Sequence, residues 1–503
     1  MHTLASPLIH AAKMAAEKTA VIDGDKSFSY RELHERCCLL GAALSELGLK
    51  KGDRVAIWAG NGHRYIETYV AVPAAGFVVV PLNTRHAEAE LIYALNDSDT
   101  KVLISDRDPG ALADCVDHVI MIPDAYDEIL SKAGTISLGE GIDENDLAGL
   151  FYTGGTTGAS KGVMLSHRNL ISNTFHYMAQ IPQYESDIML VMAPLFHAAG
   201  SNGVLANIWT LGTQVTLDAF APGSALDLIE KHKATETLGV PTMLAAIAEE
   251  QHIRPREIQS LRMIAHGGSP IATEVLRRTH TAFPTAQLFE VYGATELSPL
   301  CTVLCNEQDL IDSPLARSCG RPIVGNEITI LDPEGKPVER GEIGEVVVSG
   351  PNVMMGYWNK DEQTAAVLKN GCYWTGDLGY MDTEGFVFLV DRSKDMIVSG
   401  GENVYCTEVE EILYQYPDIL EAAVFGVPDD KWGESVWAVV VPREGKEIDI
   451  AAVLSFCQER IAGYKVPKGI DIQNEALPKS GPGKVLKREL RAPYWDNQDR
   501  AVN

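Results

Sequence analysis

The chain has 503 residues, too many for one hydrophobic core, which predicts at least two domains joined by a hinge. Its hydrophobic fraction of 46% and charged fraction of 22% are those of a folded protein rather than a disordered or fibrous one. A formal net charge of −27 disfavours nonspecific binding to nucleic acids and to anionic membranes, because like charges repel. An anionic substrate therefore requires a local basic site.

The cysteines and the apolar runs bear on the compartment. Nine cysteines occur without a C-x-x-C pair or a histidine spacing suited to zinc, which favours free thiols. Residues 1–18 lack a sustained apolar run behind basic residues, so we expect no signal peptide. The longest apolar run, 69–82, is shorter than the roughly 18 residues of a membrane span. We expect a cytoplasmic protein with no transmembrane segment and no nucleic-acid partner; a homodimer is compatible with the sequence.

Short β-branched runs alternate with helical patterns in the first part of the chain. This alternation predicts parallel sheets covered by helices, with ligands at the carboxyl ends of the strands. From about residue 315, closely spaced turns and short strands predict a small barrel-like antiparallel subdomain. Strands are expected at 54–59, 76–81, 101–105 and 118–122, and helices at 30–47 and 87–95.

A compact α+β lobe is expected after the charged segment DRSKD at 391–395. The sequence TEVE at 407–410 has the spacing of a capping box, which predicts that a helix begins there. The expected fold class is α/β, with two parallel-type sheets in the larger domain. The expected domains are an N-terminal domain over 1–393, with its barrel-like subdomain at about 315–391, and a smaller mobile C-terminal domain over 394–503.

A glycine-rich segment, LFYTGGTTGASKGV at 150–163, follows an apolar strand. Glycines let backbone amides approach a polyphosphate, threonine hydroxyls donate to its oxygens, and Lys161 neutralises its charge. The segment is not a Walker A loop, because Ser160 and Gly162 replace the residues that flank the lysine there. The pattern predicts a phosphate-binding loop; an ordinary flexible turn is the alternative.

Three further segments follow in order: VYGATELS at 291–298, YWTGDLG at 373–379 and LPKSGPGKV at 477–485. With the glycine-rich segment and DRSKDMIVSGGEN at 391–403, they resemble the motifs of the adenylate-forming superfamily of acyl- and aryl-CoA synthetases, nonribosomal adenylation domains and luciferases. The resemblance covers nearly the whole chain. It implies an ATP-dependent carboxylic acid:CoA ligase that forms an acyl-adenylate and pyrophosphate, then passes the acyl group to CoA.

The resemblance also implies the residues that bind ATP and its metal ion. A hydroxyl and a carboxylate at Thr153 and Glu296 suit a Mg²⁺ ion that bridges phosphate oxygens. Asp377 matches the aspartate that accepts both ribose hydroxyls, and Arg392 would reach the same ribose from the hinge. Gly154 stands where the family usually has serine, so an altered nucleotide affinity is expected. The whole ATP-binding set is Thr153, Gly154, Gly155, Thr156, Thr157, Lys161, Gly268, Ser269, Tyr292, Gly293, Thr295, Asp377 and Arg392.

Two residues are implied to act on the reacting groups. Lys484 matches the lysine that would stabilise charge on the forming adenylate; a solvated surface lysine is the alternative. His197, in APLFHAAG at 193–200, matches a histidine beside the bound carboxylate, and a core histidine is the alternative. Small residues after His197 leave room for an aromatic or a medium- to long-chain acyl group. The expected acyl pocket contains His197, Ala198, Ala199 and Asn202.

The C-terminal lobe contains a second set of matches. Lys394 matches the family's hinge between the two lobes. Gly400 and Gly401 match a narrow passage for the pantetheine arm, which a Cβ would obstruct. The implied CoA-binding residues are Gly400, Gly401, Glu402, Trp432, Tyr464 and Lys468, and packing or solubility is the alternative role for the last three.

Three other functions stay open beside acid:CoA ligation. An adenylating enzyme could load a carrier protein, although FHAAGSN at 196–202 lacks the acid that amino-acid-specific domains place there. A luciferase-like monooxygenase shares the adenylation half-reaction. A nonenzymatic nucleotide-binding regulator is disfavoured, since binding alone needs neither Lys484 nor the glycine passage. The implied cofactor is Mg²⁺, and ATP, CoA and a carboxylic acid are the small-molecule partners.

Overall fold

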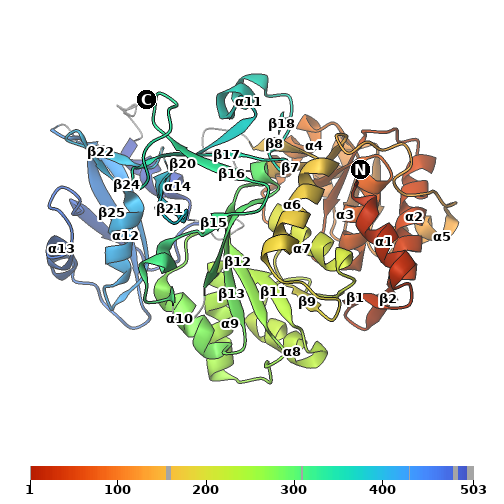
Figure 1. The fold of residues 1–503 in the computed structure, drawn as a ribbon, viewed down its shortest axis with the longest axis horizontal. Helices are drawn as coiled ribbons and strands as arrows, with labels where there is room; N and C mark the ends of the chain where they lie inside the picture. The colour runs from red at the N-terminus through yellow and green to blue at the C-terminus, as the bar shows by residue number, and fades with distance from the viewer. Residues whose placement is uncertain are drawn as a thin grey trace. The chain divides into compact units, whose positions relative to one another are not determined.

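The computed structural model describes residues 2–153, 160–306, 310–392, 394–429, 431–479 and 485–495. These residues form two compact units. Unit 1 comprises residues 1–268, 273–328 and 348–373, and unit 2 comprises 269–272, 329–347 and 374–503. Figure 1 follows the chain through its elements from the red N-terminus to the blue C-terminus.

A mixed sheet of unit 1 contains a run of parallel strands. Its strand order is β15-β14-β13-β12-β11-β9-β10-β1-β2, and all neighbours from β13 to β1 are parallel. Because parallel strands end at the same edge, the loops that follow β9, β12 and β13 leave the sheet together. The strands are β1 (Thr19–Asp23), β2 (Lys26–Ser29), β9 (Ile188–Val191), β10 (Thr213–Thr216), β11 (Glu236–Gly239), β12 (Met263–Gly267), β13 (Gln287–Gly293), β14 (Leu300–Asn306) and β15 (Arg321–Pro322).

Another mixed sheet of unit 1 has the order β18-β8-β7-β4-β3-β5-β6. The neighbours from β7 to β6 are parallel, whereas β8 is antiparallel to both β7 and β18. The hairpin of β7 and β8 therefore brackets the glycine-rich segment. The strands are β3 (Arg54–Trp58), β4 (Val78–Pro81), β5 (Thr100–Ser105), β6 (His118–Met121), β7 (Leu147–Thr153), β8 (Lys161–Ser166) and β18 (Gly356–Tyr357).

Helices cover both sheets of unit 1, and α2 packs on α3 and α5 while α6 packs on α7 (Figure 1). Helix α2 begins at a capping box, in which Ser29 and Glu32 bond to each other's backbone N–H groups. The helices are α1 (Ala5–Met14), α2 (Tyr30–Glu46), α3 (His63–Ala74), α4 (Glu88–Asp97), α5 (Asp124–Lys132), α6 (His167–Gln180), α7 (Ala198–Trp209), α8 (Pro222–His232), α9 (Pro241–Ile253), α10 (Thr273–Ala282) and α11 (Asp361–Val367), with 3₁₀ turns η1 (Gly110–Cys115), η2 (Thr295–Leu297) and η4 (Pro314–Arg317).

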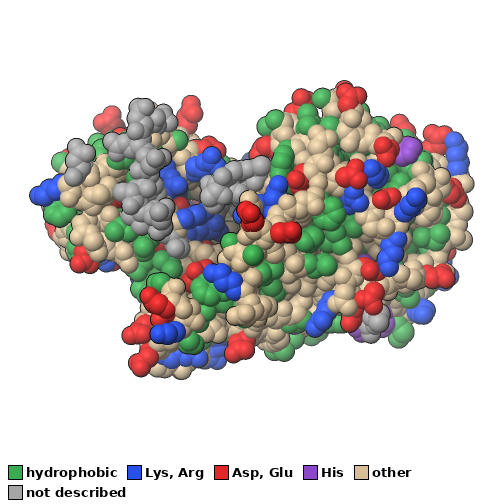
Figure 2. Space-filling model, turned by 90° about the horizontal axis from the view of Figure 1, so that it is seen from above, with side chains coloured by type: hydrophobic (Ala, Val, Ile, Leu, Met, Phe, Trp, Pro, Cys, Tyr) green, Lys and Arg blue, Asp and Glu red, His purple; other side chains and the backbone are tan. Residues whose placement is uncertain are grey.

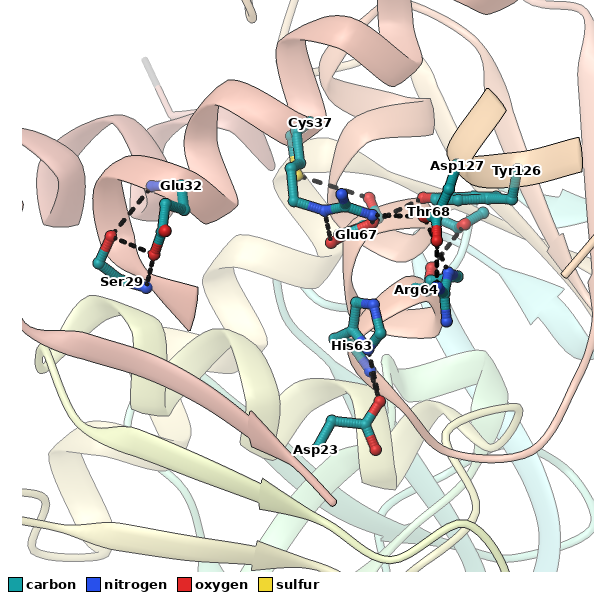
Figure 3. Close-up of polar contacts among 11 residues, drawn as sticks. Asp23, Ser29, Glu32, Cys37, His63, Arg64, Glu67, Thr68, Tyr126 and Asp127 are labelled. Carbon is teal, nitrogen blue, oxygen red and sulfur yellow. Dashed lines mark hydrogen bonds and ion pairs between the residues drawn. The ribbon is translucent and has the colours of Figure 1, made fainter. Parts of the chain in front are cut away.

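A buried polar cluster joins α2, α3 and α5 (Figure 3). The Glu67 side chain is fully buried, and Arg36 donates to its two carboxylate oxygens at 2.5 and 3.1 Å. The hydroxyl of Tyr126 donates to the same carboxylate at 3.0 Å, and Arg36 and Arg64 both bind Asp127. These bonds compensate the desolvation of a carboxylate that would otherwise destabilise the fold.

Unit 2 contains an α+β lobe whose sheet has the order β23-β22-β25-β24, with β26 beside β25. Its apolar core includes Ile397, Val424, Val440 and Leu413. The elements are β22 (Ile397–Ser399), β23 (Glu402–Val404), α12 (Cys406–Tyr414), β24 (Ile419–Asp429), β25 (Gly433–Pro442), α13 (Ile450–Gln458), β26 (Gly469–Ile472) and α14 (Lys487–Trp495). The short strands that precede this lobe are β16 (Glu327–Leu331), β17 (Gly344–Ser349), β19 (Leu368–Lys369), β20 (Cys372–Met381) and β21 (Val387–Arg392).

The predicted α/β fold class is confirmed, and the predicted helix at 30–47 is α2. The capping box predicted at 407–410 is wrong. Helix α12 begins at Cys406 after Tyr405, so Thr407 lies inside the first turn, where its hydroxyl donates to the Val390 carbonyl oxygen. The backbone N–H of Cys406 instead donates to the Asp391 carboxylate at 2.6 Å, which supplies the cap from another strand.

The structure also bears on membrane spanning, on the cysteine thiols and on the distribution of surface charge. In the part of the chain that the structure describes, no helix is both long and apolar enough to cross a lipid bilayer. The nine cysteines form no disulfide bond within the described part of the chain. On the face shown in Figure 2, acidic and basic side chains are interspersed. The net charge of −27 is therefore not gathered into one acidic patch on this face.

A second buried carboxylate, Glu236, lies at the amino-terminal end of β11. This is the opposite edge from the one at which the loops after β9, β12 and β13 leave the sheet. Gln183 and Asn207 donate to it at 2.9 and 3.2 Å, and the Arg262 guanidinium is 3.9 Å away. Burial, together with the neighbouring Asp187 carboxylate, raises the pKa of Glu236 to about 7. The folded state therefore binds a proton here that the unfolded chain releases at lower pH.

We predict that Glu236→Gln removes a pH-dependent loss of stability. The raised pKa means that the contribution of Glu236 is fully present below about pH 4.5 and is lost as pH rises to about 7. Glutamine stays neutral, and once the Asn207 amide turns over, its amide nitrogen can donate to Asn207 Oδ1, which has no hydrogen-bond partner among the described residues. Between pH 4.5 and 7.5 the variant should gain about 3 kcal/mol on the parent in free energy of unfolding, measured by guanidinium denaturation. The exposed Glu249→Gln is the control, and an equal pH dependence in parent and Glu236→Gln contradicts the prediction.

Candidate active site

The ends of the glycine-rich segment lie opposite each other in the β7–β8 hairpin. Thr153, the last residue of β7, pairs with Lys161, the first residue of β8. The predicted ATP-binding residues between them, Gly154, Gly155, Thr156 and Thr157, lie outside the described residues. The hairpin therefore places the predicted hydroxyl and the predicted lysine at the same edge of the sheet.

Tyr357 separates Lys161 from Glu296. The ammonium of Lys161 lies 4.7 Å from the centroid of the Tyr357 ring, and the phenol hydroxyl donates to Glu296 Oε1 at 2.8 Å. Burial and the adjacent carboxylate raise the pKa of Tyr357, so the phenol stays protonated and remains a donor. Lys161 and Glu296 thus both contact one tyrosine, and among the described residues no direct ion pair joins them.

Strand β18 explains how Tyr357 reaches this position. Its backbone pairs with β8, with Tyr357 opposite Val163, and the Trp358 N–H donates to the Gly162 carbonyl oxygen at 2.8 Å. Just before β18, the Met354 N–H donates to the Glu296 carbonyl oxygen at 2.9 Å. One short edge strand therefore connects the phosphate-loop strand to the turn that contains Glu296. Sequence reasoning missed Tyr357, because MGYW at 355–358 has no chemical signature of its own.

Further predicted ATP-binding residues lie at the ends of two neighbouring parallel strands or in the loops that follow them. Gly268 follows β12 with a φ of +83°, which favours glycine, and Ser269 comes next. Tyr292 and Gly293 end β13, where a Cβ at Gly293 would lie 1.8 Å from the Pro299 carbonyl oxygen. Thr295 then opens η2. Because β12 and β13 are paired, these loops are adjacent.

His197 lies directly before α7, in the loop that follows β9. Burial, with a smaller effect of Arg85, lowers the pKa of His197 to about 4. The ring is therefore neutral at physiological pH, and its Nε2 has no hydrogen-bond partner in the described ranges. A neutral imidazole donates or accepts a hydrogen bond but supplies no positive charge to a carboxylate.

The predicted acyl-pocket residues occupy the first turns of α7. Ala198 is buried, and Ala199 packs beside Val291 against an apolar cluster. The Asn202 amide donates to Asn173 Oδ1 at 2.5 Å. Asn173 in turn bonds to the backbone of Leu300. Asn202 therefore holds the helix to the strand that follows the Glu296 turn, a contact that the sequence did not predict.

Unit 2 brings together the predicted ribose-binding pair. Asp377 and Arg392 are cross-strand partners on β20 and β21, and Arg392 Nε lies 3.2 Å from Asp377 Oδ1. Gly376, inside β20 directly before Asp377, has a φ of +72° and donates its N–H to Glu345. Lys394, the predicted hinge residue, follows β21, and burial lowers its pKa to about 8.

Part of the predicted CoA set also comes together in unit 2. The Gly400 N–H donates to the Trp432 carbonyl oxygen at 2.8 Å, and a Cβ at Gly400 would lie 2.7 Å from the indole. Gly401, by contrast, has open space where a Cβ would be, with a φ of +87°, and Glu402 opens β23. The packing against Trp432 therefore requires glycine at position 400, independently of the predicted passage for the pantetheine arm. Tyr464 and Lys468 are exposed on segments that precede β26.

The predicted catalytic residue Lys484 lies outside the described residues. Three residues later, the Lys487 ammonium lies 2.8 Å from Glu410 Oε1, which joins α14 to α12. Burial would lower the pKa of Lys487, but Glu410 and other negative groups outweigh it and raise the value, so this lysine is charged. Sequence reasoning missed this pair, because lysines and glutamates at such positions are usually solvated.

Comparisons with known proteins match the chain along most of its length. The family model of the AMP-binding enzyme matches residues 8–358, and that of the AMP-binding enzyme C-terminal domain matches residues 408–484. A feruloyl-CoA synthase from Amycolatopsis sp. is 40% identical over 97% of this chain and 98% of that protein. A long-chain-fatty-acid–CoA ligase from Bacillus subtilis is 34% identical over 98% of this chain and 95% of that protein.

A solved structure is similar throughout. The o-succinylbenzoate coenzyme A synthetase from Bacillus subtilis, in complex with ATP and a magnesium ion, has a TM-score of 0.86 and 30% identity. The match covers 96% of this chain and 98% of that one. The predicted superfamily is confirmed, and with it the fold. This chain belongs to the family of AMP-binding, adenylate-forming enzymes.

Proposed function

We propose that this protein is an ATP-dependent carboxylic acid:CoA ligase. It converts an acid and ATP to acyl-AMP and pyrophosphate, and then acyl-AMP and CoA to acyl-CoA and AMP. The observation that carries this function is the end-to-end similarity to relatives named as CoA ligases, of which one is 40% identical. The predicted enzyme class, an acid–thiol ligase, agrees with them. The substrate is an aromatic or a fatty acid, since the relatives are named for acids of both kinds.

The first prediction concerns the products. At steady state, the purified protein should release AMP and pyrophosphate only when ATP, Mg²⁺, CoA and a suitable acid are all present. The measurement is CoA-dependent AMP release over a panel of acids from acetate through hydroxycinnamic and long-chain acids. Release of ADP and phosphate would place the protein in a different ligase class. Acid-dependent exchange of pyrophosphate into ATP, with no AMP release when CoA is added with any acid of the panel, would favour a carrier protein as the acceptor.

The geometry around Tyr357 supports a nucleotide site at the β7–β8 hairpin. Lys161 would bind phosphate oxygens, and Glu296 with Thr153 would hold Mg²⁺, which would neutralise charge on the phosphates. Among the described residues, no group of three or more His, Cys, Asp or Glu is placed to hold a metal ion. A cation here would need oxygens from the nucleotide, and Mg²⁺ suits that arrangement, because one or two carboxylates plus phosphates usually bind it.

A second prediction tests Tyr357. Tyr357→Phe removes the hydroxyl that donates to Glu296. The variant retains the aromatic ring that contacts the Lys161 ammonium. ATP should bind about tenfold more weakly in the presence of Mg²⁺, as when the hydrogen-bond partner of a metal ligand is lost, and with unchanged affinity in its absence. Isothermal titration calorimetry with and without Mg²⁺ measures both values. The control is Tyr93→Phe, which removes a hydroxyl bonded to Asp97, and equal losses with and without Mg²⁺ would show a general packing defect.

The remaining site residues have complementary proposed roles. Asp377 and Arg392 would bind the ribose hydroxyls, for which their present contact must open. His197, being neutral, would hydrogen-bond the substrate carboxylate rather than pair with its charge. Lys484 would therefore supply the positive charge at the reacting centre. Gly401, Trp432, Tyr464 and Lys468 would bind CoA. The cytoplasmic location and a homodimer stay predictions.

We further propose the division into an N-terminal domain over 1–393 and a mobile C-terminal domain over 394–503. The two family models end and begin at residues 358 and 408, so Lys394 falls between them. Lys484 and Gly401 belong to the same lobe but act in different half-reactions. The lobe would therefore reorient between the two steps, with Lys394 as the hinge.

A third prediction follows from this hinge. Proline fixes φ near −65°, so Lys394→Pro should hold one orientation. Adenylation should survive, whereas thioester formation should fall by roughly 10²-fold or more, as expected when reacting groups are misplaced. The two half-reactions are measured separately, by pyrophosphate exchange and by transfer from a supplied acyl-adenylate. Lys394→Ala, which keeps backbone freedom, is the matched control. A folded proline variant that transfers acyl groups at the parental rate disproves the rotating lobe.

A further inference from the structure

The turn after β3 joins the carboxyl-terminal edges of both mixed sheets of unit 1. Gly60, Asn61 and Gly62 lie between β3 and α3. The Gly60 N–H donates to the Asp106 carboxylate at 2.7 Å, beyond β5 in the same sheet. The Asn61 N–H donates to the Asp218 carbonyl oxygen at 3.2 Å, beyond β10 in the other sheet. A Cβ at Gly60 would lie 1.8 Å from the Asp218 carboxylate, so the turn is pressed against that loop.

The same turn is anchored where α3 begins. His63 Nδ1 lies 2.5 Å from Asp23 Oδ2, and the His63 N–H donates to the same oxygen at 3.1 Å (Figure 3). Thr216 donates to the other carboxylate oxygen at 2.9 Å. Burial alone would raise the pKa of Asp23, but the hydrogen bonds outweigh it and lower the value to about 2. Because Asp23 ends β1 and Thr216 ends β10, the turn is fixed to strands of the sheet that leads to His197.

The side chain of Asn61 extends from this anchored turn to the segment between β9 and α7. Its amide nitrogen donates to the carbonyl oxygens of Val191 and Ala193 at 3.3 and 3.0 Å. Its Oδ1 accepts the N–H of Leu195 at 2.9 Å. With 8% of its surface exposed, Asn61 binds three backbone groups where β9 ends, and one of them, the Val191 carbonyl oxygen, also accepts the Leu217 N–H at 3.2 Å.

We propose that Asn61 is a positioning residue for the carboxylic acid substrate. Asn61 fixes the segment 191–195 and thereby orients His197 and the start of α7. This role in substrate binding rests on the proposed function. It acts through that segment and does not touch the reacting atoms. An asparagine suits this task, because its amide presents a donor and an acceptor as a neighbouring strand would.

The contacts beyond Leu195 transmit the position of this segment to the substrate side. The Ser201 hydroxyl donates to the Leu195 carbonyl oxygen at 2.7 Å, and the His197 N–H donates to the Pro194 carbonyl oxygen at 3.2 Å. A Cβ at Gly200 would lie 2.7 Å from the same Pro194 oxygen, so the segment 191–195 packs directly against the first turn of α7. A shift at Leu195 therefore moves His197.

The test compares Asn61→Ala and Asn61→Asp with the exposed Asn96→Asp. Alanine removes all three bonds. Aspartate keeps the acceptor for Leu195 and places negative charge against the carbonyl oxygens of Val191 and Ala193. In both Asn61 variants the KM for the acid should rise at least tenfold, while the KM for ATP stays within twofold of the parent. Hydrogen exchange followed by mass spectrometry should show lost protection in the peptide that contains Leu195 in Asn61→Ala, and a smaller loss in Asn61→Asp, with other strands unchanged.

The outcomes separate this inference from the proposed function. Absence of CoA-dependent AMP release from the parent protein contradicts the proposed function. The hydrogen-exchange measurement then still decides whether Asn61 fixes the segment 191–195. An active parent, with Asn61 variants that keep the parental KM for the acid, overturns the inference. Equal changes in the KM for acid and for ATP, or a fall in kcat alone, assign Asn61 a purely structural role and also overturn it. Asn61→Asp preserves side-chain volume and provides the test if Asn61→Ala fails to fold.

Discussion

The parallel register of the strands in unit 1 is the constraint on which the site depends. Parallel neighbours end at a common edge, and their backbone groups are satisfied within the sheet up to that edge. The segments after β9, β12 and β13, which contain His197, Gly268 and Glu296, therefore begin side by side although they are far apart in sequence. The antiparallel strands β8 and β18 complete this arrangement, because their pairing places Lys161 and Tyr357 on adjacent backbones.

Amide side chains at this edge bond to backbone groups where the strands begin or end. Asn61 binds the segment after β9, Asn173 binds Leu300, and Asn352 donates to the carbonyl oxygens of Leu297 and Leu300. Amides suit this use, because one side chain offers both a donor and an acceptor and carries no charge that burial would penalise. The edge is therefore rigid where the loops start, which is the condition for holding reacting groups at a fixed separation.

Buried structural carboxylates and the charged groups of the candidate site differ in how they are paired. The acidic chain pairs its buried carboxylates, as Glu67 with Arg36, or protonates them, as the raised pKa of Glu236 indicates. At the candidate site, by contrast, Tyr357 keeps Lys161 and Glu296 apart, and His197 is neutral. Lys161 and Glu296 are thus not neutralised by each other, whereas Asp377 and Arg392 of unit 2 form an ion pair. This difference distinguishes Lys161 and Glu296 from the structural clusters of the same protein.

The sequence by itself determined the family and the α/β class, and it predicted the site residues, because glycines, hydroxyls and charges at motif spacing report local chemistry directly. It also located helix α2, whose cap and apolar face are local in sequence. Tyr357, Asn61 and Lys487 were not predicted, and the cap of α12 was predicted wrongly, because each depends on a partner from a distant segment. Asn61 meets Leu195 across 134 positions, and Cys406 is capped by Asp391 from another strand. Only the tertiary structure decided these roles, since hydrogen bonds between segments follow from strand order and register, which no local pattern encodes.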